Sequence, residues 1–322
     1  MKNFHGKRSN PHSPPSRSIQ ELRTELAEKI AWFTGSSERF MAEAAGLLLA
    51  RRTAPSAPCS GTYEPGIIVV AQGSKRVDLG QTSFVYDQSR YLLTAVDLPI
   101  VSQVVEASEA KPLLAMAVKL DMSVVRELLS WHEIDVRGTS SDSHAMVTGE
   151  VTSELLSACN RLLEVLAAPK DIGFLSGLIQ REIVYRLLSG PEGVRLRAIA
   201  TLGDQSHRTA KAITWIRDNY RKSFRIDDLA QLAGMGVSTF HHHFRVLTSM
   251  SPLQYQKQLR LQAARGRMLV DGLDATTVAI DVGYESVTQF NREYSRFFGQ
   301  PPVRDVRALL SSAHAATELL SK

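Results

Sequence analysis

The sequence contains very little cysteine, and this scarcity excludes several classes of protein. Its 322 residues include only two cysteines, Cys59 and Cys159, which are 100 positions apart and belong to no C-x-x-C motif. A disulfide framework is therefore excluded, and a reducing cytoplasm is the expected location.

Long apolar runs are also missing. Runs such as "GLLLA", which begins at Gly46, are far too short to cross a bilayer. Residues 1–17 are basic and rich in Pro and Ser, and no apolar stretch follows them, so they do not form a secretory signal. We expect residues 1–17 to be a disordered basic arm.

Motifs that mark common catalytic sites do not occur either. The chain has no G-x-S-x-G, P-loop or G-x-G-x-x-G sequence. A metal-dependent cupin enzyme needs two or three histidines on its strands, and no histidine lies between Cys59 and Leu120. We therefore expect no catalytic residues, no metal site and no cofactor.

The charge is distributed unevenly along the chain. Residues 207–310 contain 15 Lys and Arg against 9 Asp and Glu, a net charge of +6. Residues 18–206 contain 18 against 23, a net charge of −5. A basic C-terminal third behind an acidic body indicates that an anionic partner binds at the C-terminal end.

An internal repeat runs through this basic third. Apolar residues with steps of 3, 4 and 3 predict one buried stripe on a helix, and the same steps recur fifty positions later. The two stripes are Val237, Phe240, Phe244, Leu247 and Val287, Phe290, Tyr294, Phe297. Each is followed by a proline, Pro252 or Pro302, and preceded by a short apolar helix and a turn that contains glycine. This arrangement is typical of two helix-turn-helix units.

Further helices surround these two units. Residues 251–269 contain many good helix formers and no internal proline, so they predict one long connecting helix. Residues 207–222 predict the helix that opens the domain, with Ala212, Trp215 and Ile216 packed inward. Small residues at Ala230 and Ala279 would allow two helices to approach closely.

The opposite face of each second helix carries the candidate DNA-binding residues. These are Ser238, His241, His242 and Arg245 in the first unit, and Thr288, Asn291, Arg292 and Ser295 in the second. All eight side chains form hydrogen bonds and none is acidic, so neither face would be repelled by phosphates. Both faces suit the major groove of double-stranded DNA.

Three adjacent histidines in the first unit raise the alternative of a metal site. Neighbouring side chains on a helix point about 100° apart, so three consecutive histidines cannot converge on one ion. His241 and His242 fall on the candidate DNA-binding face, whereas His243 falls beside the buried stripe. For His241 and His242, a solvated helix face is the alternative to DNA contact.

These motifs resemble the AraC/XylS family of transcriptional regulators. The resemblance rests on "STFHHHFRVLTSMSPLQYQKQLRLQAARGRML" and, more specifically, on "VAIDVGYESVTQFNREYSRFFGQPP", which together cover about 100 residues. It implies that two recognition helices enter successive major grooves on one face of the DNA, about one helical turn apart.

The chemistry of each side chain suggests its role in DNA contact. Arg292 is the best candidate for bidentate bonding to guanine, and Asn291 could read adenine. Ser238, Thr288 and Arg245 are as well suited to phosphate as to a base, and Ser286 is a candidate helix cap.

The region between Tyr63 and Leu120 has a different residue pattern. Short segments rich in Val, Ile, Leu and Tyr are separated by Gly, Pro, Asp and Ser, which predicts a small β-barrel or sandwich. After Asp121 the pattern becomes helical. This body resembles the N-terminal region of one branch of the same family, which implies a cupin-like, ligand-sensing barrel followed by dimerisation helices.

The expected fold class is therefore α+β, with an N-terminal cupin-like barrel and a C-terminal all-α double helix-turn-helix domain. The expected boundaries are 1–17 for the arm, 18–206 for the sensing and dimerisation domain (barrel about 55–121, helices about 122–200), 207–310 for the DNA-binding domain (first unit about 226–247, second about 275–298) and 311–322 for the tail.

Two features of the body leave alternatives open. Cys59 is either a thiol that senses electrophiles or oxidants, or a neutral loop cysteine, whereas Cys159 lies on an apolar stripe and is expected in the core. The helices predicted at 150–168 and 172–189 have more apolar surface than one face needs, which implies either burial under the barrel or a partner subunit.

The function that these patterns predict is a cytoplasmic, nucleoid-associated transcriptional regulator. It would bind DNA as a homodimer and respond to a small-molecule effector, with RNA polymerase as a further candidate partner, and either activation or repression would fit. The alternatives are a cupin-type metalloenzyme, or a ligand-free interaction module fused to a DNA-binding domain.

Overall fold

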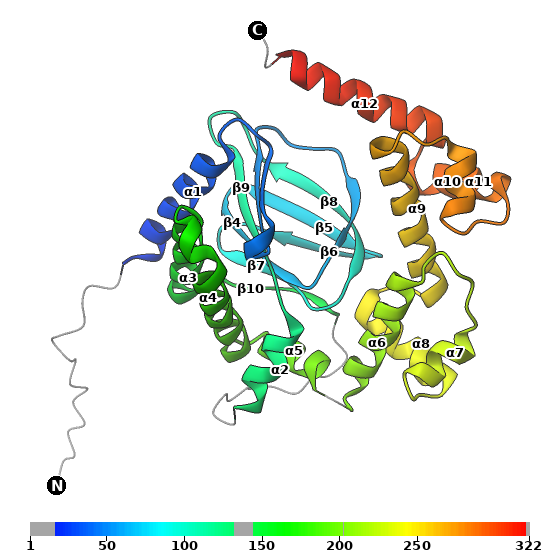
Figure 1. The fold of residues 1–322 in the computed structure, drawn as a ribbon, viewed down its shortest axis with the longest axis horizontal. Helices are drawn as coiled ribbons and strands as arrows, with labels where there is room; N and C mark the ends of the chain where they lie inside the picture. Colours follow the sequence, from blue (N-terminus) through cyan, green and yellow to red (C-terminus); the bar gives the residue numbers. More distant parts are fainter. Residues whose placement is uncertain (1–16, 132–143, 202, 320–322) are drawn as a thin grey trace.

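A computed structural model describes residues 17–131, 144–201 and 203–319 (Figure 1). An N-terminal body of two antiparallel sheets with helices is followed by a C-terminal region made of helices, which confirms the predicted fold class. The predicted N-terminal arm lies almost entirely outside the described residues. No helix within the described ranges combines the length and apolar character that crossing a membrane requires.

The chain enters the body through helix α1 (Ile19–Thr34). Ser18 caps its first turn: the Ser18 hydroxyl accepts a hydrogen bond from the Glu21 amide, and the Glu21 carboxylate accepts one from the Ser18 amide. Leu22, Leu26 and Ile30 form its buried stripe. Hydrophobic spacing and a capping box therefore define this helix and the face that it buries.

The strands form two sheets, and all neighbouring strands described in each sheet pair antiparallel. A six-stranded sheet has the order β1-β2-β9-β4-β7-β10, and a four-stranded sheet has the order β3-β8-β5-β6. The strands are β1 (Arg39–Ala42), β2 (Leu47–Arg52), β3 (Cys59–Tyr63), β4 (Gly66–Gln72), β5 (Ser74–Leu79), β6 (Thr82–Tyr86), β7 (Arg90–Thr94), β8 (Leu98–Glu106), β9 (Leu113–Lys119) and β10 (Met146–Glu150); the short 3-10 helix η1 (Glu43–Ala45) joins β1 to β2.

The strands extend beyond the expected range of about 55–121 at both ends. Strands β1 and β2 precede that range, and β10 follows it as the edge partner of β7. β2 continues into the charged pair Arg51 and Arg52, and this obscures the alternation of an apolar strand. β10 is separated from β9 by a helix, so no local turn signal indicates that it belongs to the sheet.

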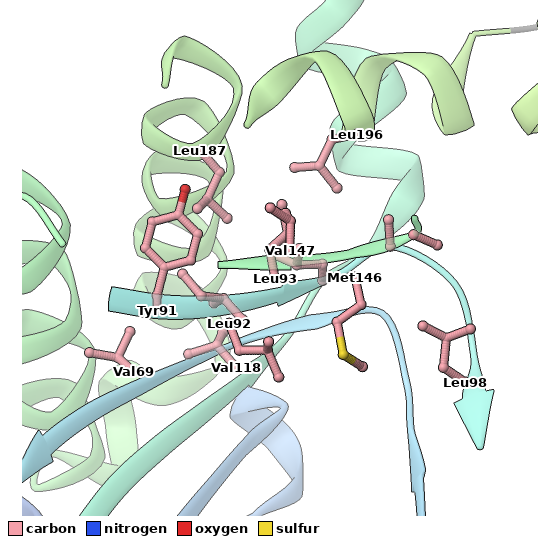
Figure 2. Close-up of a cluster of buried hydrophobic side chains, with 14 of the residues drawn as sticks. Val69, Tyr91, Leu92, Leu93, Leu98, Val118, Met146, Val147, Leu187 and Leu196 are labelled. Carbon is pink, nitrogen blue, oxygen red and sulfur yellow. The ribbon is translucent and has the colours of Figure 1, made fainter. Parts of the chain in front are cut away.

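Helices cover the outer face of the six-stranded sheet (Figure 1). Figure 2 shows Leu93 and Val147 on the side of the sheet that faces Leu187 and Leu196. The helices of the body are α2 (Met122–Ser130), α3 (Ser153–Leu166), α4 (Pro169–Ser189) and α5 (Gly193–Ala200). Side chains that alternate along the same strands therefore contribute to two layers of core, one under the helices and one between the sheets.

The C-terminal region contains two helix-turn-helix units joined by a long helix. Its helices are α6 (Gln205–Asp218), α7 (Ile226–Leu232), α8 (Val237–Thr248), α9 (Pro252–Val270), α10 (Ala275–Asp281), α11 (Val287–Phe298) and α12 (Pro302–Leu319). α7 and α8 form the first unit, and α10 and α11 form the second. α9 runs beside the sheets and separates the two units (Figure 1).

The hydrophobic cores of the two units are organised differently. Phe240, Phe244 and Tyr255 belong to the same continuous cluster of buried side chains as the sheets of the body. Phe290 and Tyr294 belong to a separate, smaller cluster. The first unit is therefore fused to the N-terminal body through its core, whereas the second packs around its own core.

Candidate nucleic-acid interface

Helix α8 is positioned by aromatic packing on its inner side. Phe240 and Phe244 are fully buried, their ring centroids lie 5.6 Å apart, and Phe244 meets Tyr255 of α9 edge-on, also at 5.6 Å. The helix ends at Ser249, whose φ of 59° lies in the left-handed region. These contacts fix which face of α8 is turned away from the core.

Helix α11 is held by a buried polar network as well as by apolar packing. The Tyr294 hydroxyl donates a hydrogen bond to Asp305 of α12 at 2.8 Å, and Asp305 also pairs with Arg265 of α9 at 2.8 Å. Burial, and then the hydrogen bond to Asp305, raises the pKa of Tyr294, so this phenol remains a proton donor. α9, α11 and α12 are therefore tied together at one point.

The turn before α11 requires glycine. Gly283 has a φ of +94°, and a Cβ atom at this position would lie 2.0 Å from the Arg221 carbonyl oxygen. Only glycine combines that backbone conformation with such a close approach. The corresponding turn of the first unit contains Gly234, with a φ of +61° and much more space around it.

None of the eight sequence-predicted residues is buried. Six are exposed and two, His241 and Ser295, are half-buried. The exposed residues are Ser238, His242, Arg245, Thr288, Asn291 and Arg292. His243 is half-buried. The faces opposite the two aromatic stripes are therefore open to a partner.

Local hydrogen bonds distinguish some of these polar residues from others. The Ser295 hydroxyl donates to the Asn291 carbonyl oxygen at 2.7 Å, so its only proton is already used within the helix. The Ser286 hydroxyl accepts a hydrogen bond from the Gln289 amide, which confirms its predicted role as a helix cap. Arg292 has no ion pair within the described part of the chain.

One cleft of about 1190 Å³ joins the two units. Arg245 of the first unit and Arg292 of the second both line it, together with Arg296 and Lys257. Its one acidic lining residue is Glu293, which accepts hydrogen bonds from the Tyr284 hydroxyl and the Gln289 side chain. The cleft is therefore strongly cationic.

Helix α9 contributes residues to this cleft that the repeat alone does not reveal. Gln254, Lys257, Gln258 and Leu261 follow one helical face, and all four line the cleft. They oppose Tyr255 and Leu259, which are buried. The sequence signal for them is their helical spacing on one side of the predicted connecting helix, as on α8 and α11.

The N-terminal body forms another wall of the cleft. Gly80, Gln81 and Thr82, at the turn between β5 and β6, line it together with His144. Gly80 packs so closely that a Cβ atom there would lie 2.8 Å from the Ser249 carbonyl oxygen at the end of α8. The body therefore reaches the same cleft as the two arginines of the helix-turn-helix units.

Polar contacts join the body directly to the first unit. His144 Nδ1 lies 3.0 Å from the Val246 carbonyl oxygen and 3.1 Å from the Ser249 hydroxyl. The Ala145 amide donates to the Leu247 carbonyl oxygen at 3.1 Å. These bonds attach the segment that leads into β10 to the last turn of α8.

An ion pair at the same junction is nearly buried. Arg217 of α6 pairs with Asp97 at 2.7 Å, and the Asp97 side chain is only 6% exposed. Burial raises the pKa of Asp97, and the Arg217 charge opposes this shift. The Tyr255 hydroxyl also donates to the Asp97 carbonyl oxygen, at 2.8 Å. Asp97 therefore bonds to two helices of the C-terminal region.

The two cysteines differ in environment. Cys159 is fully buried in α3, as predicted, and burial raises the pKa of its thiol to about 12. Cys59 is exposed at the start of β3. Within the described residues, no group of three or more His, Cys, Asp or Glu side chains is arranged to hold a metal ion.

Helix α4 has one buried side and one exposed side. Ile183, Val184, Leu187 and Leu188 are buried, whereas Phe174, Leu178 and Tyr185 are 73%, 49% and 44% exposed. The interpretation that the surplus apolar surface is buried against the body therefore holds for one side of the helix, and the other side has no cover within the described chain.

Comparison with known proteins gives two family matches. Residues 43–195 match the N-terminal domain of AraC-type transcriptional regulators, and residues 229–308 match a helix-turn-helix domain. The first match runs from η1 to the start of α5 and leaves out α1 and β1, and the second runs from within α7 to within α12.

Similar proteins include transcriptional regulators. The chain is 29% identical over 107 residues to the activator RhaS of Yersinia pestis, which covers 33% of this chain and 39% of that relative. It is 24% identical over 151 residues to the regulator ExsA of Pseudomonas aeruginosa, which covers 47% and 54%. The chain thus spans about half, or less, of the length of these curated relatives.

A solved structure is similar over most of the fold. ToxT from Vibrio cholerae, in a complex with (E)-4-(8-methylnaphthalen-1-yl)but-3-enoic acid, aligns with a TM-score of 0.54 and 10% identity over 80% of this chain and 98% of ToxT. At that identity the likeness concerns the fold. The two family matches, which together cover most of the chain, show that it belongs to the AraC family of transcriptional regulators.

Proposed function

We propose that this protein is a sequence-specific DNA-binding regulator of transcription whose N-terminal body senses a small molecule. One observation carries the DNA-binding half of the proposal. Arg245 and Arg292, from repeated units, line one cationic cleft although they lie 47 positions apart in the sequence. A cleft with four cationic side chains against one carboxylate, reached by both units, suits a polyanion that spans them.

The residues of the two recognition faces and the cleft divide into two proposed classes of DNA contact. Arg292 and Asn291 read base edges in one major groove, and Ser238, His241 and His242 enter the next. Arg245, Thr288, Lys257 and Arg296 bind phosphates, which sets position without sequence preference. Ser295 contributes least, because its hydroxyl proton is bonded to the Asn291 carbonyl.

The sensing half rests on the N-terminal body and on a relative. ToxT, which shares the fold, has been solved with a bound carboxylic acid. We propose that the body of the present chain likewise binds an organic effector. Since the first unit shares its core with that body, ligand binding there would act on α8 directly.

Assembly and location complete the proposal. The exposed side of α4, with Phe174, Leu178 and Tyr185, is the proposed homodimer contact, because burying this side would remove apolar surface from water. The protein would act in the cytoplasm, at the nucleoid, by binding alone and without catalysis. RNA polymerase is the proposed partner in activation, the mode that the name of RhaS states for that relative.

Selection of DNA sites by the purified full-length protein tests this function. Fragments would be enriched from a random duplex library and then titrated in gel shifts against scrambled duplexes. The proposal requires an enriched motif, tighter binding to it than to the scrambled duplex, and affinity that falls steeply with salt. Enrichment of no motif, or equal affinity for both duplexes, would contradict it.

Two further measurements examine the finer points. Light scattering on the wild type and on a Phe174→Ser variant tests the dimer: the variant should be monomeric, and equal masses for both proteins would contradict the α4 contact. Metal analysis of the purified protein tests the absence of catalysis by a cupin-type site, because stoichiometric iron or manganese would favour a metalloenzyme.

A further inference from the structure

The inner face of the four-stranded sheet contains one lysine. Along β5, Val77 and Leu79 are buried on the inner face of the sheet. Lys75, two positions before Val77, lies on the same face. Arg76 and Asp78 alternate outward, where they pair with each other at 2.9 Å. Lys75 therefore points a positive charge toward the apolar space between the sheets.

The ammonium group of Lys75 has a phenol as its partner. Lys75 Nζ donates to the Tyr63 hydroxyl at 3.2 Å and lies 5.8 Å from the centre of the Tyr63 ring. No carboxylate of the described chain pairs with it. Two of its three protons are therefore free to bind a further acceptor.

A second phenol beside this pair is unpartnered. Tyr86 faces Lys75 across the β5–β6 pair, is 1% exposed, and its hydroxyl has no hydrogen-bond partner in the described structure. Burial, and then the nearby Tyr63, raises the pKa of Tyr86 well above its ordinary value, so the group is a neutral donor. A buried hydroxyl without a partner costs free energy that a ligand acceptor would recover.

Space adjoins these donors on strand β3. Gly61 lies on the same face of β3 as Tyr63, two positions away, and a Cβ atom built there would find its nearest neighbour, Ile100 Cδ1, at 4.0 Å. Tyr63 and Lys75 are half-buried, so the donor cluster is accessible from outside. Val77 is the next inward residue after Lys75 on β5, Ile100 pairs with Gly61, and both apolar side chains are buried.

We propose that Lys75, Tyr63 and Tyr86 form the effector site of this protein, and that they bind the carboxylate of a monoanionic ligand whose remaining part is apolar. One ammonium balances one negative charge, and the two phenols add neutral donors to the carboxylate oxygens. The apolar walls match an apolar body better than a sugar or a polyphosphate. This inference rests on the proposed sensing function and specifies its ligand class.

A direct route leads from this site to the first recognition helix. Phe84 and Thr82 lie on the same face of β6 as Tyr86, and the Phe84 ring meets His144 edge-on at 6.4 Å. His144 in turn contacts Val246 and Ser249 at the end of α8. A ligand that shifts Tyr86 would therefore move a strand that packs against the DNA-binding cleft.

The test uses the full-length protein and a panel of sodium monocarboxylates, from butyrate to decanoate with benzoate, each compared with its matched alcohol. Binding is measured by calorimetry and by the shift of the melting midpoint. At least one carboxylate should bind, and its alcohol should bind about tenfold or more weakly. If no carboxylate of the panel exceeds its alcohol, the inference is wrong.

Variants locate the site. Lys75→Met should weaken carboxylate binding by about tenfold to a hundredfold, and Gly61→Val should block it by filling the space beside Tyr63. Arg76→Met, on the outer face of the same strand, is the matched control and should leave binding unchanged. Equal losses in Lys75→Met and Arg76→Met would overturn the assignment.

A stability measurement without any ligand tests whether the Tyr86 hydroxyl lacks a hydrogen-bond partner. Tyr86→Phe removes a hydroxyl that has no partner, so its melting midpoint should stay within about 1 °C of the wild type or rise. Tyr255→Phe removes a hydroxyl that donates to the Asp97 carbonyl and should lower the midpoint by a few degrees. Equal losses in both variants would show that Tyr86 is satisfied and would overturn the site.

Gel shifts on the selected duplex separate this inference from the proposed function. If Lys75→Met binds DNA as the wild type does but no longer responds to carboxylate, both proposals stand. If the wild type binds DNA with no response to any carboxylate, the effector site is refuted while DNA binding stands. If the wild type binds no DNA sequence-specifically, the proposed function itself fails.

Discussion

The two helix-turn-helix units have nearly the same local design but different surroundings. Both bury an aromatic stripe with the same spacing, and each places one arginine of its polar face on the same cleft. The first unit shares a continuous core with the sheets, whereas the second has its own core around Phe290 and Tyr294. A signal from the body therefore reaches the first unit through the shared core, and reaches the second through α9 and through the segment after α6, where Arg221 packs on Gly283.

This comparison predicts that the same core truncation has different consequences in the two units. Phe244→Ala should lower the stability of body and first unit together, by about 3–5 kcal/mol, because the cavity opens into their shared core. Phe290→Ala should destabilise the second unit by a similar free energy but leave the melting transition of the body and first unit unchanged. Calorimetry with hydrogen exchange resolves the two cases.

Hydrogen exchange also shows how the comparison could fail. In Phe244→Ala, faster exchange should extend to residues 98–100 and 145–147 of the body. In Phe290→Ala it should stay within residues 275–298 and their neighbours. Acceleration confined to the C-terminal region in both variants would mean that the first unit is no more attached to the body than the second.

The turn glycines give the next largest contrast. Gly283→Ala combines a left-handed backbone with a Cβ atom 2.0 Å from the Arg221 carbonyl oxygen, so we expect a loss of about 3 kcal/mol or more. Gly234→Ala has the left-handed φ but open space, so we expect about 1 kcal/mol. Denaturant titration of each variant measures the difference, and equal losses would show that the contact at Gly283 relaxes.

The two cleft arginines should differ in what they contribute to recognition. Arg292→Ala should lose about 1–3 kcal/mol of discrimination between the selected and the scrambled duplex, because it is the proposed base contact. Arg245→Ala should weaken both duplexes about equally and reduce the salt dependence. Gel shifts at two salt concentrations measure this, and an equal loss on both duplexes for Arg292→Ala would argue against base reading.

Ion pairs in the two regions give the smallest contrast. Arg217→Ala removes the countercharge of the nearly buried Asp97 at the junction with the body, and we expect a loss of about 1–2 kcal/mol, reduced because the Arg217 side chain is 41% exposed. Arg267→Ala breaks a more exposed pair with Asp281 in the second unit and should cost about 0.5 kcal/mol. Urea titration would measure both losses, and a larger loss for Arg267→Ala would reverse the comparison.

Much of the C-terminal region could be predicted because its signals are local. The spacing of Phe240, Phe244 and Leu247 determines both the buried and the exposed face of α8, and the same steps recur in α11. A short helix, a turn and a second helix lie within about 25 residues of each other. Periodicity alone is therefore enough to place Arg292 on the outside.

The N-terminal body was less accessible to such reasoning because its contacts are distant in sequence. The contacts of Asp97 with Arg217 and Tyr255 join residues more than 100 positions apart. The inward direction of Lys75 is visible only once β5 is paired with β6, since alternation alone does not say which face is the core. Lys257 is not among the predicted residues for a different reason, because it lies on the connecting helix and outside the repeated units.

Hydroxyl-radical footprinting of the full-length protein on its selected duplex tests the central claim most directly. Two recognition helices that enter successive major grooves should protect two segments on one face of the DNA, about 10 base pairs apart from centre to centre. Arg292→Ala should weaken the protection of one of these segments and leave the protection of the other unchanged. A single protected segment, or two segments on opposite faces of the duplex, would contradict the account.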